Sequence, residues 1–148
     1  MLIREWKITD LDVIVKLLTQ MNEALGEDQV LIESNIKEHF VRMEEQKETY
    51  ENYVLEEEQK IIGYMSLLFY RSLYHKKGTA QINELIVDEE NRNKGLGKEL
   101  LQYGIKRAQE REMDEIEIGV EKENIKAIKF YKDNGIEEEY LLLGKEFE

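Results

Sequence analysis

The chain has 148 residues, with no cysteine, no proline and only two histidines. Without cysteine, the protein has no disulfide, no thiol nucleophile and no cysteine-ligated zinc. His39 and His75 lie 36 residues apart, a poor basis for a metal site, so no metal is expected. Because proline is a common boundary signal, its absence leaves glycine and capping residues to mark the ends of the predicted elements.

Long apolar runs are missing too. The longest nearly apolar run, Ile61–Tyr70, is far shorter than the ~20 residues that a membrane-spanning helix needs. The first five residues lack the apolar stretch of a signal peptide. The sequence therefore predicts a cytoplasmic protein with no membrane partner.

Positive charge is scarce, since 21 Lys and Arg stand against 33 Asp and Glu and the formal net charge is -12. This balance argues against a nucleic-acid partner bound through a broad cationic face. Residues 91–111 are the exception, with six basic and two acidic side chains. Such a segment suits a small polyanionic ligand, and a solvated helix face with balancing charges elsewhere is the alternative.

Apolar residues make up 41% of the chain and charged residues 36%, which supports one buried core with a highly charged surface. The length predicts a single domain over residues 1–148. Apolar spacings of three and four predict helices over 9–26, with Thr9 as N-cap, 32–43, 96–108 and 124–133. Aliphatic and aromatic runs predict strands over 2–6, 50–55, 61–70, 80–87, 116–120 and 136–143.

The order of these elements predicts a mixed α+β fold. Residues 50–70 read as an antiparallel hairpin, and the strand-helix-strand unit over 80–120 favours parallel pairing. Strict alternation along 80–87 places Ile82, Glu84 and Ile86 on one face and Leu85 and Val87 on the other. Glu84 is then a carboxylate on an otherwise apolar face.

The segment Arg92–Lys98, spelled RNKGLGK, lies where a strand gives way to a helix. Glycines there let the backbone approach a ligand and direct unpaired N–H groups at it, and the helix dipole favours phosphate. A tight turn with close packing is the simpler alternative. Glu99 after Lys98 rules out a G-x-x-x-x-G-K-[ST] loop, and Leu100 occupies the third glycine position of G-x-G-x-x-G.

Here the sequence resembles the GNAT superfamily of N-acetyltransferases, whose acetyl-CoA signature is R/Q-x-x-G-x-G/A. Arg92, Gly95 and Gly97 fill that signature, after the strand end Leu85-Ile86-Val87. A later family motif, N-x-x-A-x-x-x-Y-x-x-x-G-F, is matched by Asn124, Ala127, Tyr131 and Gly135, with Ile136 in place of the phenylalanine. A proline that is common two residues after the valine is Glu89 here.

The resemblance implies a central, mostly antiparallel mixed sheet, splayed between two parallel strands and flanked by about four α-helices. The splayed strands map to 80–87 and 115–120. It also implies an acetyl-CoA-dependent enzyme. The implied cofactor-binding residues are Leu85, Ile86, Val87, Arg92, Asn93, Lys94, Gly95, Leu96, Gly97, Lys98, Asn124, Ala127 and Tyr131. Asn124 is equally well explained as a helix N-cap, and one residue can fill both roles.

The implied reaction is attack of an amine on a thioester. By resemblance, Tyr131 donates a proton to the departing thiolate, and a backbone N–H near Val87 stabilises the oxyanion. Without the motif, Tyr131 reads as a core residue of a helix. Glu84 is the candidate general base, directly or through water, because an amine with a pKa near ~10.4 is mostly protonated at neutrality. A salt-bridge role for Glu84 stays open.

The acceptor is the least defined partner. By resemblance its site lies in residues 11–43 and 71–79, with Tyr70, Tyr74 and His75 as candidate lining residues. Surplus acids at Glu23, Glu27, Asp28, Glu33, Glu44 and Glu45 would attract a cationic amine such as an aminoglycoside, a polyamine or a peptide N-terminus, or are solvated surface. Two other readings are a noncatalytic acyl-CoA-binding regulatory module and a cofactor-free structural domain. The sequence leaves a homodimer through the C-terminal strand open.

Overall fold

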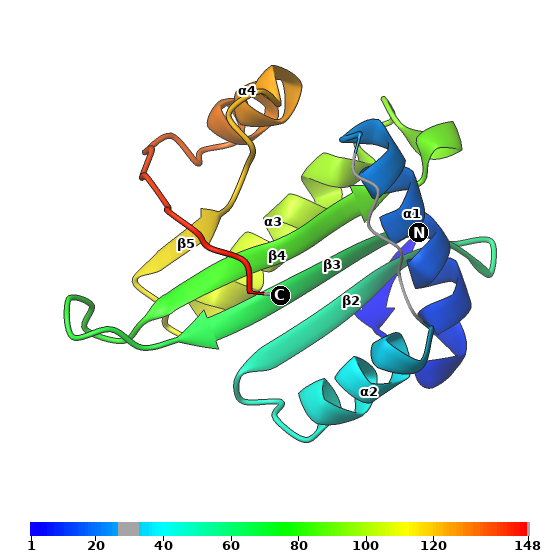
Figure 1. Ribbon diagram of the computed structural model, residues 1–148, viewed down its shortest axis with the longest axis horizontal. Coiled ribbons are helices and arrows are strands. Elements are labelled where there is room, and N and C mark those ends of the chain that lie inside the picture. Colours follow the sequence, from blue (N-terminus) through cyan, green and yellow to red (C-terminus); the bar gives the residue numbers. More distant parts are fainter. Residues whose placement is uncertain (27–32, 148) are drawn as a thin grey trace.

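The computed structural model describes residues 1–26 and 33–147 as a sheet with helices on both faces (Figure 1). Its helices are α1 (Leu11–Ala24), α2 (Glu33–Glu44), α3 (Leu96–Glu110) and α4 (Ile125–Asp133), and its strands are β1 (Leu2–Glu5), β2 (Tyr50–Glu57), β3 (Lys60–Tyr70), β4 (Thr79–Val87) and β5 (Glu115–Ile118). In the described residues the strand order follows the sequence, from β1 to β5. The first three pairings are antiparallel, and β4 and β5 are parallel. The predicted mixed α+β class is confirmed.

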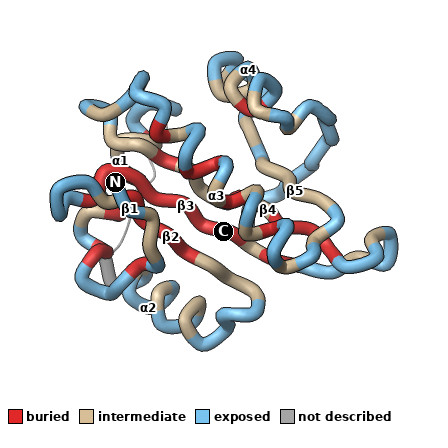
Figure 2. The backbone as a smooth tube through the Cα atoms, turned by 180° about the vertical axis from the view of Figure 1, so that it is seen from behind, coloured by how far each residue is buried: buried red, intermediate tan, exposed pale blue. Residues whose placement is uncertain are grey.

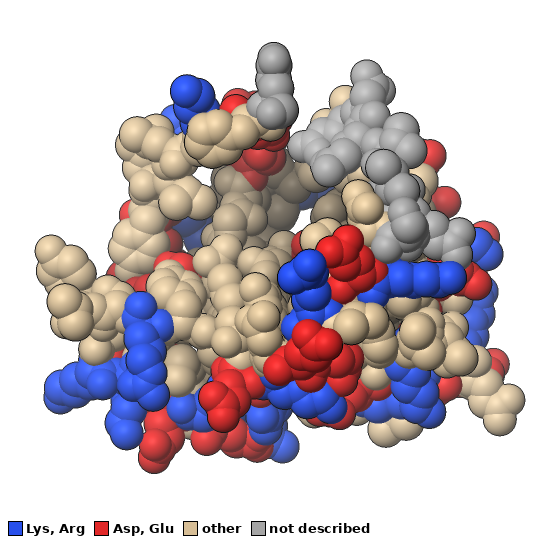
Figure 3. Space-filling view, turned by 60° about the horizontal axis from the view of Figure 1, so that its bottom comes forward, with Lys and Arg blue, Asp and Glu red and all other residues tan. Residues whose placement is uncertain are grey.

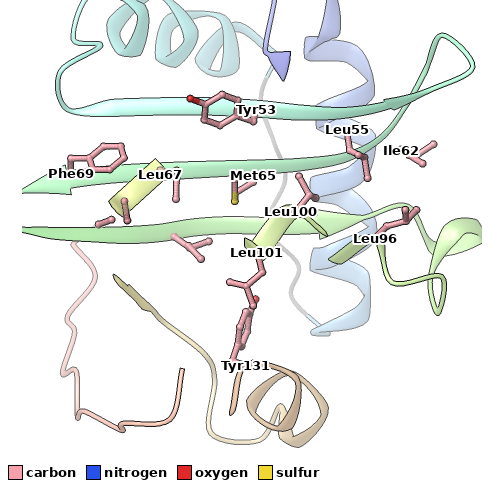
Figure 4. Packing of buried hydrophobic residues seen from close by; sticks show 13 residues of the cluster. Tyr53, Leu55, Ile62, Met65, Leu67, Phe69, Leu96, Leu100, Leu101 and Tyr131 are labelled. Carbon is pink, nitrogen blue, oxygen red and sulfur yellow. The ribbon is translucent and has the colours of Figure 1, made fainter. Parts of the chain in front are cut away.

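Two apolar clusters cover the two faces of the sheet. On one face, Trp6 and Tyr64 join apolar residues of α1 and α2. On the other, Leu100 and Leu101 of α3 pack on Met65 and Leu67 of β3, and Tyr131 of α4 belongs to the same cluster (Figure 4). Burial is concentrated in the central strands, whereas α4 and the C-terminal segment are mostly exposed (Figure 2).

The start of α1 differs from the prediction. Thr9 is not its N-cap, because residues Ile8–Asp10 form a single 3-10 turn and α1 begins at Leu11. The carboxylate of Asp10 accepts the backbone N–H of Lys7 at 2.8 Å and is held by the guanidinium of Arg4 at 2.9 and 3.0 Å. An ion pair between Arg4 of β1 and Asp10 therefore sets this boundary, and Asp10 rather than Thr9 is the residue whose side chain binds the backbone before α1.

The predicted strand over 136–143 is also wrong. Residues 136–147 form no helix or strand, and Leu141, Leu142 and Leu143 are 71 to 86% exposed. The chain leaves α4 through Gly135, and the N–H of Ile136 still bonds to the carbonyl of Tyr131. Three glutamates follow, and the aliphatic residues beyond them have no neighbouring strand to pair with among the described residues.

None of the described helices has both the length and the apolar character needed to cross a bilayer. Within the same ranges, no three acidic or histidine side chains gather closely enough to hold a metal ion.

The turn between β2 and β3 yields a stability prediction. Glu58 and Gln59 both have positive φ, 51° and 66°, as a type I′ turn requires, although Asn-Gly is the preferred pair there. We expect the double substitution Glu58→Asn/Gln59→Gly to raise the free energy of unfolding by about 1 kcal/mol, measured by urea unfolding. Glu58→Ala/Gln59→Ala is the control, because it removes the same side chains without relieving the backbone. Equal midpoints for the two double variants would contradict the explanation.

Candidate active site

The parallel strands β4 and β5 pair along only part of β4. Their register runs from Thr79 opposite Glu115 to Ile82 opposite Ile118, where β5 ends. Strand β4 continues to Val87, so residues 83–87 have no strand partner on that side among the described residues. Figure 1 shows the chain after β5 diverging from β4 toward α4. The sheet is splayed where the sequence predicted it.

A β-bulge in β4 changes which face each side chain occupies. Ser66 of β3 pairs with Glu84 and Leu67 pairs with Ile82, so Asn83 is the extra residue. Ile82 therefore packs in the cluster under α3, while Ile86 packs in the cluster under α1 and α2. The prediction that Ile82, Glu84 and Ile86 share one face is wrong for Ile82. Glu84, two residues before Ile86, lies on the α1–α2 face.

Glu84 is held by a hydroxyl of the neighbouring strand. The Ser66 hydroxyl donates to Glu84 Oε2, and Ser66 Oγ accepts the Glu84 backbone N–H at 3.2 Å. Burial raises the pKa of Glu84, and the hydrogen bond from Ser66 partly opposes that rise. No cation pairs with Glu84 among the described residues, so the salt-bridge reading has no support. A carboxylate with a raised pKa is suited to exchanging protons.

The segment after β4 forms a backbone cradle at the start of α3. Asn93 and Gly95 have φ of 64° and 77°, and alternation of such left-handed residues with others turns successive N–H groups toward one side. Among the described residues, no backbone carbonyl accepts the N–H groups from Arg92 to Lys98. These donors are the observation that fits a diphosphate.

Three basic side chains, Arg92, Lys94 and Lys98, lie at this cradle, and the charge of Arg92 helps to lower the pKa of Asp88. Arg92 donates to the Val87 carbonyl at 3.3 Å and Lys94 to the Asn91 side chain at 3.3 Å. In the described ranges, neither of them nor Lys98 forms an ion pair. Because the helix dipole disfavours cations at an N-terminus, these positions cost helix stability unless an anion binds.

The other basic residues of 91–111 have structural partners. Arg107 and Arg111 bind the carboxylate of Glu51 on β2, at 2.8 and 3.0 Å. On the face shown in Figure 3, basic and acidic side chains are interleaved. The charges at the end of α3 are therefore balanced by an acid of β2, in mostly buried ion pairs rather than on a solvated face. A polyanionic ligand remains a prediction for the start of α3.

Sequence reasoning missed Gln20, which fixes the loop before the cradle. Its side chain donates to Asp88 Oδ1 at 2.9 Å and accepts the Glu89 backbone N–H at 3.1 Å. These bonds tie the end of α1 to the turn after β4. The two partners lie 68 and 69 residues away in the chain, so no local signal indicates the contact.

Tyr131 projects from α4 toward Leu101 and is 9% exposed (Figure 4). Burial raises its pKa to about 12. Its hydroxyl has no hydrogen-bond partner among the described residues. The hydroxyl oxygen is still accessible to solvent, because no fully buried side-chain oxygen in these residues lacks a partner. The phenol is thus protonated at neutral pH, with its oxygen available to a ligand.

Asn124 caps α4, since its Oδ1 accepts the backbone N–H of Ala127 at 3.2 Å. Its amide nitrogen is left to donate elsewhere. At the other end of the site, a Cβ on Gly97 would lie 3.5 Å from the Phe130 ring and 4.0 Å from Val87. Close approach at Gly97 therefore brings α4 beside the cradle and the end of β4.

The candidate residues do not all meet. Leu85, Val87, Leu96, Ala127 and Tyr131 belong to the α3-side cluster, whereas Glu84 lies on the opposite face with Ile86. No hydrogen bond joins Glu84 to Tyr131 among the described residues. The two candidate reacting groups thus lie on opposite faces of the sheet, near the splayed part of β4.

The predicted acceptor residues give a mixed result. Tyr74 is 98% exposed, Tyr70 donates to Glu117 of β5, and His75 lies 3.7 Å from Asp114. The acids Glu27 and Asp28 lie outside the described residues, as does the side chain of Glu33. These contacts assign no acceptor pocket.

Comparisons with known proteins agree with this geometry. A family model described as Acetyltransferase (GNAT) family matches residues 16–136. An uncharacterized N-acetyltransferase of Methanocaldococcus jannaschii is 38% identical over 69 residues, which cover 47% of this chain and 30% of that protein. The match thus spans less than a third of that relative.

Solved structures share the fold along nearly the whole chain. A transcriptional regulator of Bacillus halodurans C-125 superposes with a TM-score of 0.85 at 24% identity, covering 99% of both chains. Glucosamine-6-phosphate N-acetyltransferase of Arabidopsis thaliana gives 0.83 at 18%, covering 99% of this chain and 98% of that one. An aminoglycoside acetyltransferase from an uncultured soil metagenomic sample, in complex with trehalose, gives 0.80 at 21%, covering 99% and 95%. At these identities the likeness concerns the fold alone.

Proposed function

The chain belongs to the GNAT acetyltransferase family, and we propose that it is an acyltransferase that transfers the acetyl group of acetyl-CoA to a primary amine. The transfer is direct, with both substrates bound together. The observation that carries the proposal is the row of N–H groups from Arg92 to Lys98, which have no backbone partner among the described residues, at the start of a helix that shares its apolar cluster with Tyr131. The Tyr131 hydroxyl also has no hydrogen-bond partner within those residues. The N–H groups are suited to binding a diphosphate, and the phenol is suited to protonating a leaving thiolate.

In this proposal the coenzyme lies along β4 and its diphosphate meets the cradle. Main-chain groups of Leu85, Ile86 and Val87 bind the pantetheine arm, because residues 83–87 have no strand partner on the β5 side within the described part of the chain. Asn124 adds an amide donor. A backbone N–H near Val87 stabilises the oxyanion that forms when the thioester is attacked.

Two side chains move protons. Glu84 takes a proton from the ammonium form of the acceptor, directly or through water, and the free amine attacks the thioester carbon. As the carbon–sulfur bond breaks, Tyr131 gives its proton to the thiolate, and the phenolate recovers one from the acylated nitrogen or solvent. The products are an amide and free CoA.

For the acceptor we propose a cationic amine, which the net charge of -12 would attract. The choice among an aminoglycoside, a polyamine and a peptide N-terminus needs a direct screen. Purified protein is mixed with acetyl-CoA and each amine class, and release of free thiol is followed. Coenzyme binding without thiol release from any amine would instead support the noncatalytic acyl-CoA-binding module.

Coenzyme binding gives a prediction with an internal control. Lys98→Glu is expected to weaken acetyl-CoA binding by roughly tenfold in calorimetry, because a cation beside the diphosphate becomes an anion. Lys106→Glu makes the same change of charge further along α3, where Lys106 is 3.8 Å from Glu110, and should change affinity much less.

We do not expect Lys98→Glu to destabilise the fold, since an acidic side chain in the first turn of a helix interacts favourably with the helix dipole. A loss of affinity would therefore report on the coenzyme site. Wild-type protein should also show a higher melting temperature with acetyl-CoA. Equal affinities for the two variants, or no heat at millimolar coenzyme, would contradict the cradle.

A further inference from the structure

Ser66 makes an unusual pair of contacts for a strand residue. Its hydroxyl donates to the carboxylate of Glu84 and accepts the backbone N–H of the same residue. Ser66 is 2% exposed, and it faces Glu84 where the β-bulge interrupts the register of β3 and β4. One hydroxyl therefore holds both the main chain and the side chain of Glu84.

The next hydroxyl along β3 is committed elsewhere. Tyr64 donates to Asn52 Oδ1 at 2.7 Å, and both residues are buried. Tyr64 is nevertheless coupled to both residues of the pair. Burial raises the pKa of Tyr64 most, the charge of Glu84 adds to that rise, and a hydrogen bond with Ser66 opposes it. No charged side chain from α1, α2, α3, β2, β3 or β5, within the described residues, acts on Glu84 in return. Ser66 is left as the donor that stabilises the carboxylate.

We propose that Ser66 is a positioning residue, which fixes the Glu84 carboxylate at the bulge and favours its ionised form, ready to accept a proton. The inference rests on the proposed role of Glu84 as general base. Without Ser66, the same carboxylate would remain buried but lose its hydrogen bond, so it would ionise at higher pH. It would also be free to rotate away from the substrate.

The test follows the titration of Glu84 itself, which needs no substrate. Carbon-13 spectra of protein labelled at glutamate carboxyl groups are recorded across pH, with the Glu84 signal assigned by its loss in Glu84→Gln. In Ser66→Ala we expect the midpoint to move to higher pH. Ser66→Thr keeps the hydroxyl and should restore the wild-type midpoint. Tyr53→Phe is the control, since it removes a hydroxyl of a buried residue that donates to Glu51 on β2 and leaves the bond from Ser66 to Glu84.

A second readout is the pH profile of kcat/KM with the amine found by the thiol-release screen. The acid limb in Ser66→Ala should move with the titration, with a loss on the order of tenfold at low pH that recovers as pH rises. A purely structural role would lower activity equally at every pH. Should Ser66→Thr not fold, the Ser66→Ala and Tyr53→Phe titrations decide the question.

Failure of this inference is distinguishable from failure of the proposed function. A Glu84 midpoint that Ser66→Ala leaves unchanged overturns the inference, as does an acid limb that does not follow the titration. A midpoint that moves in a protein with no acetyltransferase activity upholds the action of Ser66 on Glu84 and overturns the proposed function instead.

Discussion

Tyr131→Phe is expected to lower kcat by about 10²- to 10⁴-fold, the usual contribution of a positioned general acid. The substitution removes one hydroxyl that has no hydrogen-bond partner among the described residues, and it leaves the ring in the α3-side cluster. Affinity for acetyl-CoA should therefore stay within about threefold of wild type, because the lost interaction acts only as the thiolate departs.

The matched control is Tyr103→Phe on α3. Tyr103 is partly buried in the same cluster and packs edge-on against Tyr53, with ring centroids 4.9 Å apart. Its loss of a hydroxyl should leave turnover near wild type. Steady-state kinetics and calorimetry on both variants make the comparison, and equal turnover in Tyr131→Phe and wild type would refute the acid role.

The pH dependence supplies a second check on Tyr131. Burial raises its pKa to about 12, so the phenol keeps its proton throughout the range in which the protein is assayed. Its ionisation should therefore produce no alkaline limb in kcat below roughly pH 11. An alkaline limb near pH 10 that disappears in Tyr131→Phe would mean that this side chain is far more exposed to water than the structure shows.

The cradle could be predicted from sequence because its requirements are local. Gly95 supplies a positive φ of 77°, and the first turn of any helix leaves N–H groups unpaired. Both features depend only on residues within the seven-residue segment Arg92–Lys98. The cap of α4 was likewise predictable, since Asn124 and Ala127 are three residues apart.

Other features depend on residues far apart in the chain. The bulge at Asn83 arises from the register between β3 and β4, and a period of two along β4 alone cannot reveal it. Ser66 lies 18 residues before Glu84, and Gln20 lies 68 residues before Asp88. In each case a hydrogen bond between separate elements determines the arrangement, so only the folded chain shows it.

The missing strand over 136–143 shows the opposite limit. Its aliphatic run has the composition of a strand, but a strand also needs a neighbour with free backbone groups in reach. Residue pairing between β4 and β5 ends at Ile118, and α4 carries the chain away before residue 136. Local propensity was therefore overridden by where α4 places the segment.

Glu84→Gln is the second change with a large expected effect. It removes the proposed base while keeping an oxygen that accepts the Ser66 hydroxyl, and we expect kcat/KM at neutral pH to fall by about 10²-fold or more. Burial raises the pKa of Glu84, so in wild type activity should fall as pH falls through that raised value. The variant should lack this acid limb. Glu117→Gln on β5, where Tyr70 donates to the carboxylate, is the control and should keep the limb.

Stability should change in the opposite direction to activity. Because the folded protein holds the Glu84 proton more tightly than the unfolded chain does, its carboxyl destabilises the fold as pH rises from near ~4.3, the ordinary glutamate value, through the raised value. Glu84→Gln has no charge to bury, so its free energy of unfolding should exceed that of wild type at neutral pH, and the difference should shrink toward acid pH. Urea unfolding across pH measures both. A variant that is less active and more stable has lost chemistry rather than structure, whereas one that is less stable at neutral pH would show that the carboxylate supports the fold.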